Sequence, residues 1–166
     1  MLIVEDGTGV SNAESYATAE ELVIYAGKFG VTIPADLGAQ EALLRRAALE
    51  MDGMTWKGRK SSGEQALAWP RREVRLDGEN KPERYLPARI QYGQMALAAE
   101  IHADDVDPID KRKGAVTLDR VEGAVTREYA VIPSNSSRLL PAAPDRPSAT
   151  QFADYLLRRG LFAVRA

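Results

Sequence analysis

The chain has 166 residues, of which 45% are hydrophobic and 28% are charged, and its formal net charge at pH 7 is −2. This composition predicts one folded domain, and the negative balance argues against a dedicated nucleic-acid binder, although a local basic face stays open. The absence of cysteine excludes disulfides, zinc–thiolate sites and thiol catalysis, and no apolar run approaches the ~20 residues of a membrane span.

The N-terminal residues predict a short strand, a turn and a first helix. Residues 2–4 are apolar and predict the strand, and Gly7 and Gly9 follow in a stretch without the further glycines or lysine of a phosphate-binding loop, so a turn is expected. Thr18 with Glu21 three residues later predicts a capping box, and Gly30 predicts the end of that helix.

Residues 39–71 are the stretch around which the rest is organised. Apolar residues at helical spacing predict a helix with its core face at Leu43, Leu44, Ala47, Ala48 and Met51. Gly53 is expected to end this helix in the left-handed conformation.

Both tryptophans of the chain follow that helix, at Trp56 and Trp69. Two large rings in one compact segment favour packing against the helix over stacking on a ligand. Ser62 and Gln65 have the spacing of a capping box and predict a short helical turn. Arg59 and Arg71 are placed to stack on the rings or to pair with acids.

The next elements are a polar loop or loose hairpin at residues 72–83 and a helix from Pro87 to about His102. The core face of this helix is expected at Ile90, Leu97, Ala98 and Ile101. Its small residues, among them Gly93, should let another helix approach closely.

Four aspartates crowd behind that helix, at Asp104, Asp105, Asp107 and Asp110. The glycine and terminal glutamate of a calcium-binding loop are absent, so we expect a solvated acidic loop and no metal site. The single histidine, His102, has no catalytic partners in the pattern, and we find no nucleophile, acid–base pair or cofactor motif. The sequence therefore predicts a protein that is not an enzyme and needs no cofactor.

Residues 115–121 and 124–132 alternate in polarity around Glu122 and Gly123, which predicts a β-hairpin. Because a lone two-stranded hairpin is marginal in water, it is expected to lie on a helix or to pair with a neighbouring subunit. The candidate subunit-interface residues are Val116, Leu118, Val125, Arg127 and Tyr129.

The C-terminal part predicts a proline-rich linker at residues 132–147 and a last helix that Ser148 and Gln151 cap and Gly160 ends. Its aromatic side and the apolar tail either bind a partner or dock on the chain's own core; both remain open. The domain division is a core at 1–131, the linker, and a docking helix with tail at 148–166. The candidate partner-binding residues are Phe152, Tyr155, Leu156, Arg158, Arg159, Leu161 and Phe162.

Taken together, these elements predict a mainly α fold: a small helical bundle with one β-hairpin and an extended C-terminal arm that ends in a short helix. The residues that carry a family resemblance lie in its first hundred positions. They include Val4 to Gly9, Asp52-Gly53 and, most specifically, a motif of Trp56, Gly58, Gln65, Trp69, Pro70 and Arg71.

These motifs resemble a family of tailed bacteriophages and prophages whose members carry the label DnaT-like single-stranded DNA-binding protein. Their shape resembles that of head–tail connector, or adaptor, proteins. The resemblance implies a structural virion protein at the neck, assembled in the host cytoplasm during DNA packaging. It would form a ring of twelve copies that contacts the portal protein and the tail or stopper proteins. Genomic duplex DNA would pass through the lumen of this ring, and no membrane would be contacted.

Two functions follow from this resemblance. The acidic balance and the packed tryptophans favour the connector over the alternative, a single-stranded DNA-binding protein, because such a binder needs a basic groove and exposed rings. On the connector hypothesis the C-terminal helix and tail dock on the portal.

Overall fold

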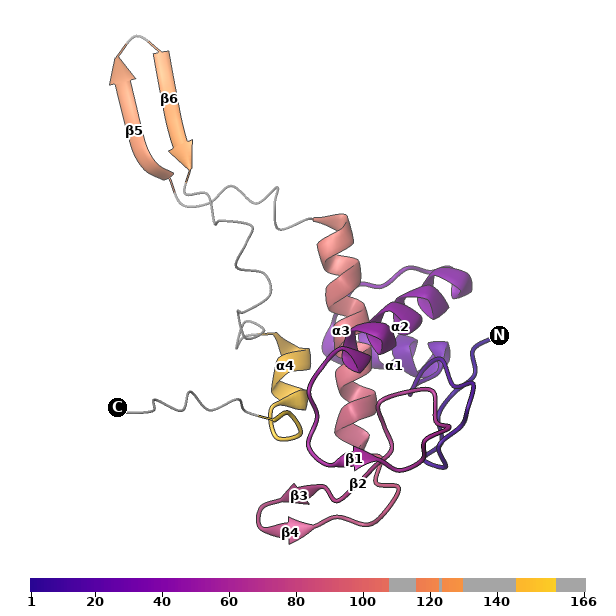
Figure 1. Cartoon of the computed structure of the whole chain (residues 1–166). Coiled ribbons are helices and arrows are strands. Elements are labelled where there is room, and N and C mark those ends of the chain that lie inside the picture. Colours follow the sequence, from indigo (N-terminus) through magenta and orange to yellow (C-terminus); the bar gives the residue numbers. More distant parts are fainter. Residues whose placement is uncertain (108–115, 123, 130–145, 158–166) are drawn as a thin grey trace, which may run out of the picture.

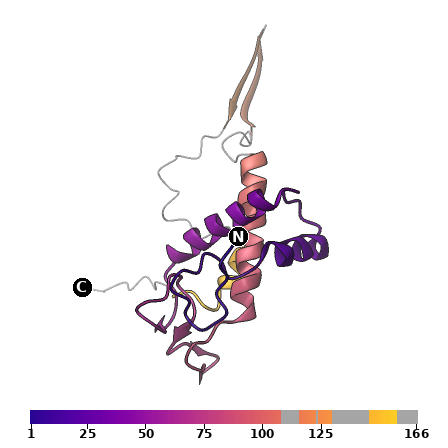
Figure 2. The same cartoon turned by 90° about the vertical axis from the view of Figure 1, so that its right-hand side faces the viewer.

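The computed structural model of the chain describes residues 1–107, 116–122, 124–129 and 146–157. The longest helix, α3, runs through the middle of the helical body, with the other helices beside it (Figures 1 and 2). The mainly α fold class is confirmed. The helices are α1 (Ala19–Phe29), α2 (Leu37–Asp52), α3 (Ala88–Val106) and α4 (Pro147–Phe152).

The strands form three antiparallel pairs in the described part of the chain. The pairs are β1 (Arg59–Lys60) with β2 (Arg71–Arg72), β3 (Arg75–Leu76) with β4 (Glu79–Asn80), and β5 (Val116–Glu122) with β6 (Ala124–Tyr129). The sequence predicted a hairpin at residues 115–132 and a polar loop or loose hairpin at residues 72–83, where the short β3–β4 pair forms. The β1–β2 pair, which also lies between α2 and α3, was not predicted.

The first helix has the predicted cap. The Thr18 hydroxyl accepts a hydrogen bond from the Glu21 N–H at 3.1 Å, and the Glu21 carboxylate accepts one from the Thr18 N–H at 2.8 Å. Gly30 ends α1 in the left-handed region at φ 65°. Phe29 is more than half exposed and rests on Tyr25, with ring centroids 4.5 Å apart.

The second helix has the predicted core face but different ends. It begins two residues before the predicted start, where the Asp36 carboxylate accepts a hydrogen bond from the Ala39 N–H at 2.8 Å. Gly53 has φ −75° and ψ −11°, so the left-handed conformation predicted for it is wrong. The buried face is Leu43, Leu44, Ala47, Ala48 and Met51.

The N-terminal segment forms a loop closed by a buried carboxylate. The predicted strand at residues 2–4 is reduced to a single parallel bridge between Val4 and Ser15. Glu5 accepts hydrogen bonds from the N–H groups of Gly7 at 2.9 Å, Gly9 at 2.8 Å and Val10 at 2.8 Å. This is the predicted turn.

A buried amide connects three parts of the core. Gln94 of α3 accepts a hydrogen bond from the Tyr16 N–H at 2.9 Å. Its side-chain nitrogen donates to the Leu44 carbonyl at 2.9 Å and to the Ser15 hydroxyl at 3.0 Å. Because every polar atom of this buried amide has a partner, it fixes the N-terminal segment and α2 against α3.

The central helix continues four residues beyond the predicted end, so Asp104 and Asp105 lie on a helix and not in a solvated loop. Arginines compensate the unfavourable charge at this helix end. Arg146 donates to Asp104 at 2.9 Å, and Arg46 donates to Asp105 at 3.1 Å. Within the described ranges no group of three acids or histidines is placed to hold a metal ion, and no helix is long and apolar enough to cross a membrane.

The last helix differs from its prediction at both ends. It starts at Pro147 and stops at Phe152, and Ser148 lies inside it. The Ser148 N–H and hydroxyl both donate to the Glu100 carboxylate, at 2.8 and 2.6 Å, so the predicted capping box is wrong. Phe152 is buried against Gly93, which confirms the close approach predicted for α3.

The β5–β6 hairpin has the predicted position around Gly123, with Val116 opposite Tyr129 and Val121 opposite Val125. The structure does not describe the side-chain surroundings of the five candidate interface residues. The predicted linker before Arg146 also lies outside the described residues. The domain boundaries therefore stay a prediction.

The contact of Phe152 with Gly93 gives a stability prediction. A Cβ at position 93 would overlap the Phe152 ring, so we expect Gly93→Ala to destabilise the fold by about 1–3 kcal/mol in urea unfolding. Gly63→Ala is the control, because nothing lies near the Cβ it would add. Equal unfolding midpoints for the two variants would contradict the packing of α4 on α3.

Candidate functional site

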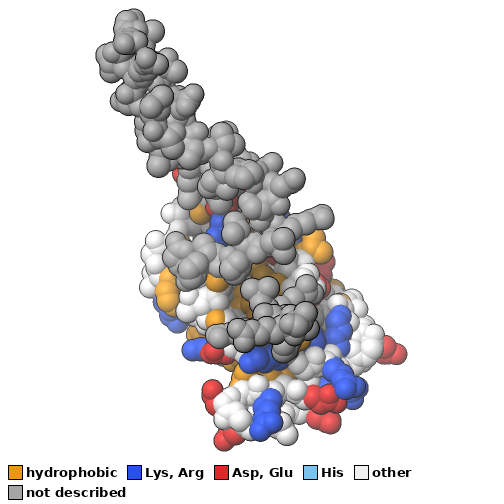
Figure 3. Space-filling view, turned by 60° about the vertical axis from the view of Figure 1, so that its left-hand side comes forward, with side chains coloured by type: hydrophobic (Ala, Val, Ile, Leu, Met, Phe, Trp, Pro, Cys, Tyr) orange, Lys and Arg blue, Asp and Glu red, His pale blue; other side chains and the backbone are white. Residues whose placement is uncertain are grey.

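The charge of this chain is unevenly distributed. Residues 57–89 contain nine Lys and Arg and five Asp and Glu, a net charge of +4. The whole chain has 22 basic and 24 acidic residues, so the remainder carries −6. Figure 3 shows basic side chains, with acidic ones between them, at the lower end of the molecule, where β1 to β4 lie in Figure 1. We call residues 57–89 the basic segment.

The rings beneath the basic segment are packed inside the protein. Trp56 and Trp69 are 3% and 0% exposed and meet edge to face, with centroids 5.8 Å apart. Phe152 packs on Trp56 at 5.2 Å, and Tyr155 on Trp69 at 5.7 Å. The packing prediction for both tryptophans is confirmed, and neither ring is available to stack on a ligand.

One arginine of the basic segment holds its backbone together. The Arg71 guanidinium donates to the carbonyls of Lys57 at 2.8 Å, Gly58 at 2.7 Å and Ala68 at 3.0 Å. Burial lowers the pKa of Arg71 from its usual value. Arg71 is therefore a structural residue, and neither the ring stacking nor the acid pairing predicted for it is found.

The other motif residues also build the fold. Gly58 has φ 72°, and a Cβ there would overlap the Arg72 carbonyl. The Gln65 amide donates to the carbonyls of Leu67 at 2.9 Å and Pro70 at 3.0 Å, and it accepts from the Ser62 N–H at 2.9 Å. The contacts of Gln65 replace the helical turn predicted at residues 62–65, which does not form.

Three cations of the basic segment have carboxylate partners: Arg59 with Glu73 at 3.0 Å, Lys81 with Glu79 at 3.2 Å, and Arg89 with Asp154 at 2.7 Å. These pairs are largely exposed and weak.

Four further cations, Lys60, Arg72, Arg75 and Arg84, are exposed and form no ion pair with any described residue. Lys60 donates to the Ala66 carbonyl at 3.3 Å, and Arg75 donates to the Gly78 carbonyl at 3.1 Å. These four side chains are open to an anionic ligand.

A polar groove of about 360 Å³ lies where the β3–β4 hairpin, the start of α3 and the residues after α4 meet. Lys57, Lys81 and Arg89 line it, together with two aspartates and the half-buried ring of Tyr85. Burial and hydrogen bonding with Tyr85 raise the pKa of Tyr155 in its wall to about 12. The groove therefore combines three cations, two aspartates and the half-buried Tyr85.

The structure does not bring the predicted partner-binding residues of the C-terminal part together on one surface. Phe152 and Tyr155 are core side chains, and Leu156 is partly buried and bridges to Trp56. Arg158, Arg159, Leu161 and Phe162 lie outside the described residues. The sequence prediction also missed the basic segment, which a count of charge along the chain, in place of the total, would have found.

The arrangement is that of a small, mainly α protein whose basic segment carries short strand pairs. A family model described as "Putative DnaT-like ssDNA binding protein" matches residues 1–166, and the chain belongs to this family. Neither a curated protein nor a solved structure matches it.

The family match corrects the connector prediction. The chain belongs to a family described by single-stranded DNA binding, so the head–tail connector, its ring of twelve copies and its portal and tail partners are not supported. The motif of Trp56 to Arg71 is no evidence for a connector, because its residues build the core and do not indicate a partner. The negative net charge misled it too, because the total conceals the basic segment.

The contacts of Arg71 give a second stability prediction. Arg71→Lys keeps the charge but cannot reach three carbonyls, so we expect a loss of about 2 kcal/mol or more in urea unfolding followed by tryptophan fluorescence. Arg72→Lys, at the exposed neighbouring position, should change stability by less than about 0.5 kcal/mol. A similar loss in both variants would show that the three carbonyl contacts contribute little.

Proposed function

We propose that this protein binds single-stranded DNA through the face formed by the basic segment. The observation that supports this proposal most is the charge distribution: residues 57–89 have a net charge of +4, whereas the whole chain has a net charge of −2. Cations that neutralise phosphates supply most of the sequence-independent affinity for nucleic acid. Lys60, Arg72 and Arg84 are the first candidates, since they are exposed and form no ion pair with a described residue.

The groove beside these cations supports the single-stranded form of the ligand. Its lysines and Arg89 can follow a backbone while Tyr85 offers a face to an unpaired base. Since both tryptophans are buried, base stacking contributes less than in proteins that bind through exposed rings. Binding should therefore depend strongly on salt and weakly on sequence. In this proposal the chain acts by binding and not by catalysis.

The proposal is tested by fluorescence anisotropy with a labelled oligo(dT) strand between 50 and 200 mM salt. Neutralising three to five phosphates predicts a slope of log K against log salt of about −2 to −3.5, since each contact on a single strand contributes ~0.7. A labelled duplex of the same length is the comparison and should bind more weakly. Absence of binding at 50 mM salt, or a slope near zero, would contradict the proposal.

The double variant Arg72→Gln/Arg84→Gln tests the assignment of the face. Losing two phosphate contacts should weaken oligo(dT) binding several-fold at 50 mM salt and reduce the steepness of the salt slope by about 1.4. Arg46→Gln is the matched control, because it removes an exposed arginine whose partner, Asp105, lies at the opposite end of α3. Because the control removes one charge and the double variant removes two, a control effect on log K about half that of the double variant would mean that only net charge matters.

A further inference from the structure

The polar groove contains an ion pair between two distant parts of the chain. Arg89, at the start of α3, donates to Asp154 at 2.7 Å, and both residues line the groove together with Lys57 and Lys81. The side chains of the pair are 54% and 62% exposed, so a ligand in the groove can reach both. A phosphate that binds Arg89 therefore meets a carboxylate at the same place.

The position of Asp154 follows from the packing of α4 on α3. Arg89 and Gly93 are four residues apart in α3, so they share one face of the helix. The buried ring of Phe152, the last residue of α4, fills the space beside Gly93. Asp154 follows Phe152 by two residues and so meets the first turn of α3.

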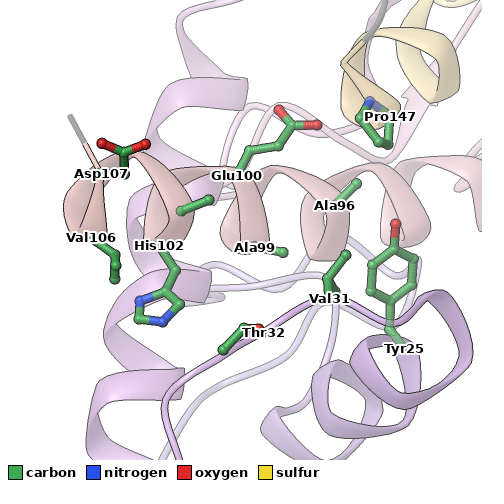
Figure 4. A pocket seen from close by; sticks show the side chains of 11 residues that line it. Tyr25, Val31, Thr32, Ala96, Ala99, Glu100, His102, Val106, Asp107 and Pro147 are labelled. Atoms are coloured by element: carbon green, nitrogen blue, oxygen red, sulfur yellow. The ribbon is translucent and has the colours of Figure 1, made fainter. Parts of the chain in front are cut away.

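The start of α4 is held on α3 as well. The Ser148 N–H and hydroxyl donate to the Glu100 carboxylate, and Figure 4 shows Glu100 and Pro147 on the same side of α3. Arg146, which precedes α4, pairs with Asp104 at 2.9 Å. Contacts at both ends of α4 thus determine where the residues after it lie.

The backbone after α4 is fixed independently of Arg89. The Lys57 N–H donates to the Tyr155 carbonyl at 2.8 Å, and the Leu157 N–H donates to the Thr55 carbonyl at 2.9 Å. The Asp154 side chain can turn when a phosphate takes its place on Arg89, but its backbone cannot leave. Its negative charge therefore stays in the groove beside the bound phosphate.

This carboxylate matters because the groove has a small excess of positive charge. Its lining includes three cations, Lys57, Lys81 and Arg89, and two aspartates, Asp77 and Asp154, a net charge of +1. Without the charge of Asp154 the same residues would carry +2. One side chain thus halves the charge available to attract a strand.

We propose that Asp154 competes with DNA phosphates for Arg89 and so limits the affinity of the groove for a single strand. This inference rests on the DNA binding proposed above. A unit charge ~4 Å away in water changes an affinity about fivefold. Because Arg89 is already neutralised by Asp154, it adds little to the salt dependence, whereas a freed Arg89 counts as one more phosphate contact.

The test measures oligo(dT) binding of the full-length chain by fluorescence anisotropy between 50 and 200 mM salt. Asp154→Asn should bind about fivefold more tightly at 50 mM salt, and its salt slope should be steeper by ~0.7. Asp154→Glu keeps the charge and should bind as the unaltered protein does. Neither substitution should move the urea unfolding midpoint, because the pair is more than half exposed.

Asp105→Asn is the matched control. It removes the same charge from a second exposed arginine pair, Arg46 with Asp105, at the far end of α3. Its affinity and slope should stay close to those of the unaltered protein. Equal results for Asp154→Asn and Asp105→Asn would overturn the inference, because the effect would then come from net charge alone.

The unaltered protein separates this inference from the proposed function. If it binds with the predicted salt slope while Asp154→Asn changes nothing, DNA binding stands and only the competition by Asp154 is contradicted. If neither protein binds at 50 mM salt, both proposals are contradicted. Binding by Asp154→Asn alone would support the competition and contradict DNA binding by the unaltered chain.

Discussion

The edge-to-face packing of Trp56 on Trp69, closed by Phe152 from α4, is the interaction on which the rest of the structure depends. Two such rings bury several hundred square ångströms, roughly 150–250 Å² each, and this burial fixes the long connection between α2 and α3 against the helices. The Trp56 indole N–H donates to the Met51 carbonyl at 2.8 Å, so the connection is tied to the end of α2 as well. A segment with little regular structure thereby acquires a definite shape.

Because the rings face inward, the polar groups of the same segment face outward. Arg71 and Gln65 satisfy backbone carbonyls inside the connection, while Lys60, Arg72 and Arg84 remain exposed at its surface. The acids of the chain gather elsewhere, with several near the far end of α3. A molecule of negative net charge can thus concentrate positive charge in one segment, while the remainder of the chain carries the excess of acids.

Local chemistry made part of this structure predictable. The capping box of Thr18 and Glu21 and the burial of the tryptophans depend on neighbouring residues or on hydrophobicity alone. Gly53 and Ser148 were predicted wrongly for different reasons. Gly53 keeps right-handed geometry, and the N–H groups of Gly53 and Met54 donate to the carbonyls of Glu50 and Met51 in a local turn. Ser148 is held by Glu100, a distant residue on α3. The basic segment could be found from charge along the sequence, but the polar groove could not, because it forms where the β3–β4 hairpin, the start of α3 and the residues after α4 meet.

The central claim is that the basic segment is the surface that meets single-stranded DNA. Its most direct test is a titration of ¹⁵N-labelled protein with a short oligo(dT) strand at low salt, followed by amide chemical shifts. The account predicts saturable shifts within residues 57–89 that vanish as salt is raised, with α1 and the far end of α3 unchanged. Shifts centred on the far end of α3, or none at concentrations where anisotropy reports binding, would contradict it.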